Sequence, residues 1–479
     1  MTPTRKTKTT ARHANHSLRF IGAAREVTGS CHLLNINGSN ILFDCGLQQG
    51  HRAKVHPIEA PLPFNPADID IVLLSHAHLD HSGMLPRLVR VGFRGTVHCT
   101  PDTLKLLDVM LRDAFHIYCK DLERDNRQRL RAGKPLLQPA YSEHDIKTAL
   151  KLCRTNEYNT VFSIGDNMTA QFLDAGHILG SAITEVRIQH GGQQTVLVYS
   201  GDLGNNDTPL MNDPALLSQA DIVLMESTYG NRNHRSQDET VVELIDIIKT
   251  AEAQNGNILI PAFAVGRTQE LIFQLGKLYH QGLLRNWVIF LDSPMAKSIT
   301  DIYSHALAHL APDDTALLRK YNSRSLADFL PNLNITESPE ESVNLNRIKS
   351  GAIIIAGSGM CNGGRIRHHL KHRLWHANTH LVFAGFQAAG SLGRILINRP
   401  RRIKLFGQTI SVKAAVHTLG GFSAHADQQQ LLHWASQFKS RPHFYLVHGE
   451  DTALTVLQEQ LQQQGHHCSI AEPGQVISL

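Results

Sequence analysis

Short apolar runs separated by turn residues make up the chain from Leu18 to about Ile222. Most are rich in Val, Ile and Leu, which is typical of strands. The runs are RFIGA, HLLNI, NILFDCG, DIVLLS, GTVHCT, MTAQFLDAG, AITEVRIQ, TVLVYSGD and DIVLMEST. Helical periodicity is sparser and is found mainly after His81 and from Asp102 to Glu123. The pattern favours a sandwich of sheets with helices on its outer faces.

Beyond Ser236 the pattern changes to strands that alternate with helices. Ser236 and Glu239 can form a capping box at the start of a helix that we expect to end at Ala253. Further helices are predicted at 268–281, from Met295 onwards and at 365–373. The apolar runs between them are NILIPA, WVIFLDS, AIIIAGS and HLVFAGF. This alternation is typical of a parallel α/β domain.

Short strands return after about Arg402, in ISVKAAVHTL, HFYLVHG and GQVISL. The sequence therefore predicts an α/β domain inserted into a β-rich domain, and we expect these last strands to rejoin the first sheets. The predicted segments are a basic arm at 1–17, the β-rich domain at 18–230, the inserted domain at 231–405 and the remainder of the β-rich domain at 406–479.

Composition narrows the class of protein. The 479 residues suffice for two domains with large cores, and no apolar run approaches the roughly 18 residues of a membrane helix. Seven cysteines without a C-x-x-C pair argue against a disulfide framework or a thiolate zinc site, and they suit a reducing cytoplasm. A net charge of +5 is compatible with a nucleic-acid partner without requiring one. Residues 1–17 carry four cations and no apolar segment, so they indicate a disordered basic arm or a phosphate-gripping arm rather than a secretory signal.

Four potential metal ligands, His76, His78, Asp80 and His81, follow the run DIVLLS. One ion with ligands at about 2.0–2.1 Å cannot comfortably take all four from so short a loop. Two adjacent ions can, if other segments add ligands and a carboxylate that bridges the ions. Candidates at the ends of other apolar runs are His177 in FLDAGHILGS, Asp202 in VLVYSGDLG and His448 in YLVHGED.

The order HxHxDH, a glycine-preceded histidine and SGD resembles the metallo-β-lactamase fold. DAGHILGSA, ESTYGNR, GFSAHAD and LVHGE narrow the resemblance to its β-CASP branch of nucleases. The chain is most similar to bacterial and archaeal relatives of the endonuclease subunit of the mRNA cleavage and polyadenylation factor, from Leu18 to Leu479. The resemblance implies an α/β fold, in which a parallel α/β β-CASP domain is inserted into a metallo-β-lactamase αββα sandwich.

The resemblance also implies two zinc ions. The ligands would be His76, His78 and His177 at the first ion, Asp80, His81 and His448 at the second, and Asp202 as the bridge. Asp44 in ILFDCG would support the ligand loop, because an acceptor on the other nitrogen orients a metal-bound imidazole. The alternative for Asp44 is a turn aspartate before Gly46.

Two such ions activate water, but they supply no proton for the leaving oxygen. His425 in GFSAHAD and Glu226 in LMEST match family motifs that resemble a general acid held by a carboxylate. The predicted catalytic residues are Asp80, His425 and Glu226. His425 would protonate O3′, so that one product carries a 5′-phosphate and the other a 3′-hydroxyl. The alternative is a structural histidine.

The inserted segment resembles the β-CASP lid, which closes over the metals and forms a cleft for a single strand. PAFAVGRTQE, GSGMCNGGRIRHH and FQAAGSLGR each lie between a strand and a helix, where backbone N–H groups favour anions. The candidates for phosphate contacts are Arg267, Ser358, Arg365 and Arg394. The alternative is that these four residues cap helices or are surface arginines that bind no phosphate.

The sequence therefore predicts a cytoplasmic, zinc-dependent ribonuclease for single-stranded RNA, acting as an endonuclease, a 5′–3′ exonuclease or both. A homodimer is compatible with it. Because the KH module and extra C-terminal domains of some relatives are missing, we expect RNA selection to rest on the cleft or a partner protein. The alternatives are a DNA-directed nuclease and a small-molecule hydrolase of the same fold, but the latter should lack the large insert and GFSAHAD. A catalytically dead scaffold should have lost metal ligands, and all seven are present.

Overall fold

The computed structural model describes residues 16–48, 57–385, 387 and 390–479. Most of the predicted basic arm, residues 1–15, lies outside the described residues. Ser17, which we assigned to that arm, already begins the first strand.

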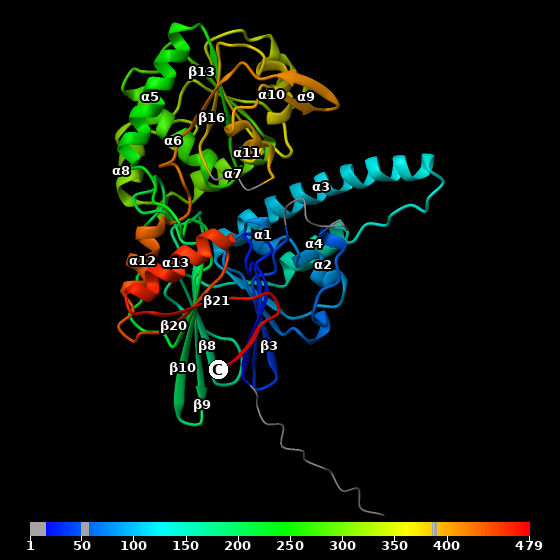
Figure 1. Cartoon of the computed structure of the whole chain (residues 1–479), viewed down its shortest axis with the longest axis vertical. Helices are drawn as coiled ribbons and strands as arrows, with labels where there is room; N and C mark the ends of the chain where they lie inside the picture. Colours follow the sequence, from blue (N-terminus) through cyan, green and yellow to red (C-terminus); the bar gives the residue numbers. More distant parts are fainter. Residues whose placement is uncertain (1–15, 49–56, 386, 388–389) are drawn as a thin grey trace, which may run out of the picture.

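Two seven-stranded sheets stack face to face in the lower half of the molecule (Figure 1). The first sheet consists, in spatial order, of β22 (Val476–Ser478), β1 (Ser17–Gly22), β2 (Cys31–Ile36), β3 (Ser39–Phe43), β4 (Ile71–Leu73), β5 (Thr96–Cys99) and β6 (Cys153–Thr155). The second consists of β21 (His467–Ile470), β20 (His443–Leu446), β11 (Ile222–Met225), β10 (Gln193–Tyr199), β9 (Ala182–His190), β8 (Met168–Asp174) and β7 (Val161–Ser163). Phe20 and Phe43 from the first sheet share one buried cluster with Val186 and Leu197 from the second. The core of the sandwich therefore lies between the sheets.

Helices cover both outer faces of the sandwich. On the first sheet these are α1 (Leu79–Ser82), α2 (Leu85–Arg90), α3 (Pro101–Arg131) and α4 (Glu143–Lys151). On the second sheet they are α12 (Gln428–Ser436) and α13 (Asp451–Gln463). Trp434 and Leu457 of these last helices pack on Phe444. The predicted αββα sandwich is confirmed.

A third sheet forms the inserted domain at the top of Figure 1. Its spatial order is β14 (Leu333–Ile335), β13 (Val288–Asp292), β15 (Ala352–Ala356), β12 (Asn257–Pro261), β16 (Thr379–Phe383) and β19 (Ala415–Thr418). All pairs are parallel. The accompanying helices are α5 (Gln237–Ala253), α6 (Arg267–His280), α7 (Pro294–His305), α8 (Pro312–Lys320), α9 (Pro339–Asn344), α10 (Ile366–Arg373) and α11 (Leu392–Ile397). The runs NILIP and AIIIA are buried along their whole length, as expected for parallel strands covered on both faces.

One prediction about the C-terminal return was wrong. The segment ISVKAAVHTL was expected to rejoin the first sheets, but its strand β19 pairs with β16 of the inserted sheet. Residues 402–405 and 408–411 form a separate hairpin of β17 (Arg402–Leu405) and β18 (Gln408–Ser411). Val416 is buried with Leu381 and Leu396, so this strand completes the core of the insert. The chain therefore returns to the sandwich after Thr418, later than the predicted boundary at 405.

The predicted capping box of α5 is present, since the Ser236 side chain accepts from the Glu239 N–H at 3.2 Å. Helix α3 is longer than predicted and ends at Arg131 instead of Glu123. Among the described residues, no helix is both long enough and apolar enough to cross a membrane.

Candidate metal centre

The ligand motif HAHLDH follows the buried strand β4. His76 and His78 lie in the extended segment before α1, whereas Asp80 and His81 lie within this helical turn. Because an extended segment and a helical turn direct their side chains differently, the two pairs point to different places. His76 and His81 are fully buried.

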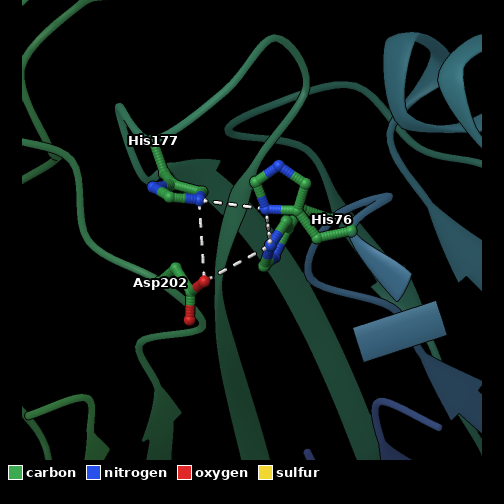
Figure 2. A group of neighbouring side chains, drawn as sticks. His76, His177 and Asp202 are labelled. Atoms are coloured by element: carbon green, nitrogen blue, oxygen red, sulfur yellow. Dashed lines mark hydrogen bonds and ion pairs between the residues drawn. The ribbon is translucent and has the colours of Figure 1, made fainter. Parts of the chain in front are cut away.

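Four donor atoms converge in a first cluster (Figure 2). His78 Nδ1 lies 3.1 Å from His76 Nε2 and 3.2 Å from His177 Nε2. Asp202 Oδ2 lies 3.4 Å from His76 Nε2 and 3.6 Å from His177 Nε2. Donor atoms in a tetrahedron about 2.0–2.1 Å from an ion are about 3.3–3.4 Å apart. The cluster therefore has the spacing of a tetrahedral metal site.

A second cluster joins residues from opposite ends of the chain. His81 Nε2 lies 3.4 Å from His448 Nε2, across 367 positions of sequence. His448 Nε2 in turn lies 3.7 Å from Asp80 Oδ2. The N–H of His448 donates to the Ala23 carbonyl at 2.6 Å, which ties the loop after β20 to the end of β1. The structure thus brings VHGE beside HLDH, as the split architecture predicts.

Asp202 stands between the clusters. Its Oδ2 faces the first cluster, and its Oδ1 lies 3.2 Å from His81 Nε2 and 3.5 Å from His448 Nδ1. Oδ1 is buried and accepts no hydrogen bond from the described residues. A buried carboxylate oxygen without a donor is costly unless a cation compensates it. The arrangement fits a carboxylate that bridges two metal ions.

Asp44 lies behind the ligand loop, fully buried. Its Oδ2 accepts from His81 Nδ1 at 2.7 Å and from the Tyr199 hydroxyl at 2.7 Å. The Ser75 backbone N–H donates to Oδ1 of Asp44 and the Ser75 hydroxyl donates to Oδ2, both at 2.7 Å. Asp44 thereby orients His81 and fixes Ser75, the residue before His76. This geometry matches the supporting role that we expected and not that of a simple turn aspartate.

Other histidines of the two clusters are held in the same way, by residues that the sequence did not single out. The contacts are Ser75 Oγ with His76 Nδ1 at 3.0 Å, the Ala424 carbonyl with His177 Nδ1 at 3.0 Å and Thr228 Oγ1 with His448 Nδ1 at 3.0 Å. Ser75 and Thr228 end the runs DIVLLS and DIVLMEST. Their position at a strand end was the signal that could have indicated a supporting role. A backbone carbonyl such as that of Ala424 leaves no trace in the sequence.

The buried environment sets the protonation of the ligands. Burial lowers the pKa of His76 and His177 well below the usual value, and that of His78 to about 4. Burial opposes ionisation of Asp202, but His448, His81 and His76 hold its pKa well below its usual range. Neutral imidazoles and an ionised carboxylate are the forms that bind metal. His81 differs, because its burial opposes protonation but Asp202 and Asp44 outweigh that burial and raise its pKa well above the usual value.

His425 and Glu226 form a separate pair next to the first cluster. His425 Nδ1 lies 3.1 Å from Glu226 Oε1, and the His425 and His177 rings are 4.5 Å apart. Fully buried Glu226 also accepts from the backbone N–H groups of Leu203 at 2.7 Å and Thr228 at 3.2 Å. Burial lowers the pKa of His425, but the Glu226 carboxylate outweighs it and raises that pKa to about 9. The raised pKa favours the protonated imidazole, the form that can donate a proton.

Comparisons with known proteins agree with this geometry. The chain matches the family models described as the metallo-beta-lactamase superfamily at residues 24–244, the Beta-Casp domain at 268–396 and the Zn-dependent metallo-hydrolase RNA specificity domain at 409–471. It is 40% identical to a ribonuclease of Thermus thermophilus over 96% of this chain and 99% of that protein. The chain belongs to the β-CASP branch of the metallo-β-lactamase-fold nucleases. It is also 31% identical to the transcription termination factor FttA of Methanocaldococcus jannaschii, over 90% of this chain and 67% of that protein.

A solved structure shares the fold of this β-CASP protein. A protein of unknown function from Enterococcus faecalis superimposes with a TM-score of 0.55 at 13% identity, over 97% of this chain and 100% of that one. At this identity the likeness concerns the fold alone.

The three glycine-rich loops of the β-CASP domain contact one another. A Cβ atom at Gly359 would stand 2.6 Å from the Phe263 ring, so the loop after β15 packs directly on the loop after β12. The Gly393 N–H donates to the Met360 carbonyl at 3.0 Å, which joins the loop before α11 to the same group. Gly266, in the loop after β12, lies against Ile178, which is next to His177 in the sequence. The loops therefore form one surface that reaches the metal centre.

The four candidate phosphate ligands differ in their availability. Arg267 is 5% exposed and forms an ion pair with Glu270. Arg365 donates to the buried Asp292 at 2.7 Å. Both guanidinium groups are therefore engaged within the protein. By contrast, the side chains of Ser358 and Arg394 are half-buried in the loop surface, and a phosphate role for all four stays a prediction.

Proposed function

We propose that the chain is a zinc-dependent ribonuclease that hydrolyses phosphodiester bonds of single-stranded RNA. The observation that carries the proposal is the pair of donor clusters around Asp202, with the His425–Glu226 pair directly beside them. Family membership supports the nuclease class. The name of the Thermus thermophilus relative and the description of the RNA specificity domain support RNA as the substrate.

Two zinc ions would fit the donor set. His76, His78 and His177 would hold one ion with Oδ2 of Asp202. The second cluster, Asp80, His81 and His448, would hold the other with Oδ1 of the same aspartate. All seven cysteines are unpaired and none belongs to either cluster, so thiolates take no part. Divalent ions supply, when bound, the Lewis acidity that activates water and offsets charge on the phosphate.

The residues of the chain would do the remaining chemistry. Glu226 holds the His425 ring through Nδ1, which leaves Nε2 free to protonate the leaving O3′. Departure of a neutral hydroxyl in place of an alkoxide lowers the barrier of the step. The products would be a 3′-hydroxyl end and a 5′-phosphate end. The unpaired cysteines also support our expectation of a reducing, cytoplasmic setting.

The test is cleavage of 5′-labelled and 3′-labelled single-stranded RNA beside the matching DNA. We expect RNA products with 5′-phosphates, abolition by a chelator and recovery on addition of zinc. His425→Ala should lower the rate by roughly 10²–10⁴ with metal content unchanged. His433→Ala, an exposed histidine on α12, is the matched control and should cleave normally.

The pattern of failure identifies the alternatives. Equal cleavage of DNA would assign the DNA-directed class. Hydrolysis of a thioester or lactam without cleavage of either nucleic acid would assign the small-molecule class. Loss of metal from His425→Ala would make His425 a ligand and refute the proton-donor role.

A further inference from the structure

Helix α3 leaves the body of the molecule as a projecting rod (Figure 1). It spans 31 residues, Pro101–Arg131, and its buried residues end at Tyr118. The residues from Cys119 to Pro139 are half-exposed or exposed, and we call them the arm. Leu122 still packs against the core, but the helix beyond it gains little from burial, so its order has to come from local contacts.

Those local contacts are present. The Asn126 side chain accepts from the Leu137 N–H at 2.8 Å and donates to the Leu137 carbonyl at 3.0 Å. Arg129 Nε donates to the Pro135 carbonyl, and the Lys134 N–H donates to the Arg129 carbonyl at 2.9 Å. The returning segment is therefore fastened along the helix. The arm is a preformed element rather than a loose loop.

Basic side chains line one face of α3 over its whole length. They are Lys105, Arg112, His116, Lys120, Arg124, Arg127 and Arg131, and all are exposed. Their spacing of seven, four, four, four, three and four residues keeps them on one face of a helix with 3.6 residues per turn. The buried residues, among them Leu107 and Met110, occupy the opposite face. We call this row the basic stripe.

The positive charge is only partly compensated towards the tip. Arg112 pairs with Asp108 at 2.6 Å near the body, and Arg124 pairs with Asp121 at 2.7 Å within the arm. Lys120 and Arg131 have no ion-pair partner among the described residues. The segment 126–139 contains Arg127, Arg129, Arg131 and Lys134 but no aspartate or glutamate. Arg127 reaches an acid, Glu123, only at 3.6 Å.

The base of the rod contacts the loop that carries His177, next to the candidate metal centre. Thr100 Oγ1 and Thr103 Oγ1 both donate to the Gly180 carbonyl, at 2.7 and 2.8 Å, in the loop that carries His177. With a rise of about 1.5 Å per residue, the tip lies roughly 40 Å from this anchor. At about 3.4 Å per stacked nucleotide, an RNA strand covers that distance with about 12 nucleotides.

We propose that the basic stripe binds the phosphodiester backbone of single-stranded RNA outside the metal centre. This inference rests on the proposed ribonuclease function. Cations in the last helical turn also complement the helix dipole, but that effect concerns only Arg129 and Arg131. It does not explain Lys120 on the exposed face or Lys134 beyond the helix end. Sequence-independent phosphate contact explains the entire row.

The test replaces Lys120, Arg127, Arg131 and Lys134 together by glutamine, which keeps helix propensity. The wild type and the variant are compared on RNAs of 6 and 24 nucleotides, in cleavage assays and in binding by metal-free protein measured by fluorescence anisotropy. We expect the Kd for the 24-nucleotide RNA to rise at least about tenfold at low salt. The slope of log K against log salt should weaken by about 0.7 per lost contact. The 6-nucleotide RNA, too short to reach the tip, should be cleaved at the wild-type rate.

The matched control is Lys439→Gln with Arg441→Gln, two exposed cations in the turn before β20. It should leave both RNAs unaffected. Equal weakening for both RNA lengths, or no change for either, would refute the stripe as an RNA contact. A changed elution volume in gel filtration with unaltered RNA binding would instead assign the arm to a protein interface, for which Leu130 and Leu136 are exposed. If the wild type cleaves no RNA, the proposed function fails, while the anisotropy comparison still decides the stripe.

Discussion

Replacement of Glu226 by glutamine should change the pH dependence of cleavage more than any other property. Glutamine has the same shape and retains an oxygen that can accept from the Leu203 N–H. It has no charge, so it removes the interaction that raises the pKa of His425 to about 9. Burial, which opposes protonation of the ring, then has no counterweight, and the pKa should fall to the ordinary value of about 6.5 or below.

The magnitude follows from the fraction of His425 that carries a proton. At pH 8 a group with a pKa of about 9 is roughly 90% protonated, whereas one with a pKa of about 6.5 is roughly 3% protonated. A general acid works only in its protonated form, so the variant should be about 30-fold slower at pH 8 and nearly unimpaired at pH 6. The rate falls as pH rises through the pKa of His425. In the variant this fall should occur at a pH about 2.5 units lower than in the wild type. Bound cations lower the pKa in both proteins, so the separation of the two profiles is the quantity to measure.

The assay is the single-turnover rate on a labelled RNA from pH 5.5 to 9.5 at constant ionic strength. Metal content and thermal unfolding should be measured in parallel, because the Thr228 N–H loses a carboxylate acceptor and stability can fall by about 1–3 kcal/mol. Glu243→Gln is a suitable control, since it removes a surface carboxylate that pairs with Arg235. A variant with the wild-type pH profile, or one slowed equally at every pH, would refute the reasoning that Glu226 sets the protonation of His425.

The remaining predictions concern the metals and are read by elemental analysis after dialysis. Asp202→Ala should lower occupancy at both clusters, because it removes the carboxylate whose oxygens face each; retention of two equivalents would exclude the bridge. The zinc content of His448→Ala should be about one equivalent in place of about two, and RNA cleavage should be lost, while circular dichroism should show that the fold is retained. Full zinc occupancy would place the last ligand elsewhere. Asp44→Asn should weaken metal binding by about 10–100-fold in a chelator competition, because the His81 ring loses its carboxylate partner, whereas unchanged affinity would leave Asp44 a purely structural role.

The clustering of the candidate metal ligands could be predicted from the sequence because metal binding restricts both residue type and position. Histidines and aspartates at the ends of apolar runs mark places where strands deliver side chains to one edge. The resemblance to the β-CASP family implied the pairing of His81 with His448, and the structure places the two rings together. The sequence could not reveal the partners of the supporting residues, because Thr228 contacts His448 and Tyr199 donates to Asp44, each across a large distance along the chain.

Strand partners and helix ends were less predictable. Strand β19 has the same short apolar pattern as the strands of the sandwich, and period alone does not select a sheet. The end of α3 was missed because residues after Glu123 are polar on every side, so no apolar stripe extends to Arg131. The ion pair between Arg365 and Asp292 joins residues 73 positions apart, and no local pattern anticipates it.

The distance along the chain between His81 and His448 has a consequence for synthesis. Closing a loop of 367 residues costs about 5 kcal/mol of chain entropy by the logarithmic estimate, before any constant is added. A nascent chain that ends at Thr418 already contains His76, His78, His177 and Asp202, but neither the proton donor nor the last ligand. On the proposed function, such a chain lacks both the proton donor and the last ligand, so competence to cleave would arise only after the final segment has been made and has docked.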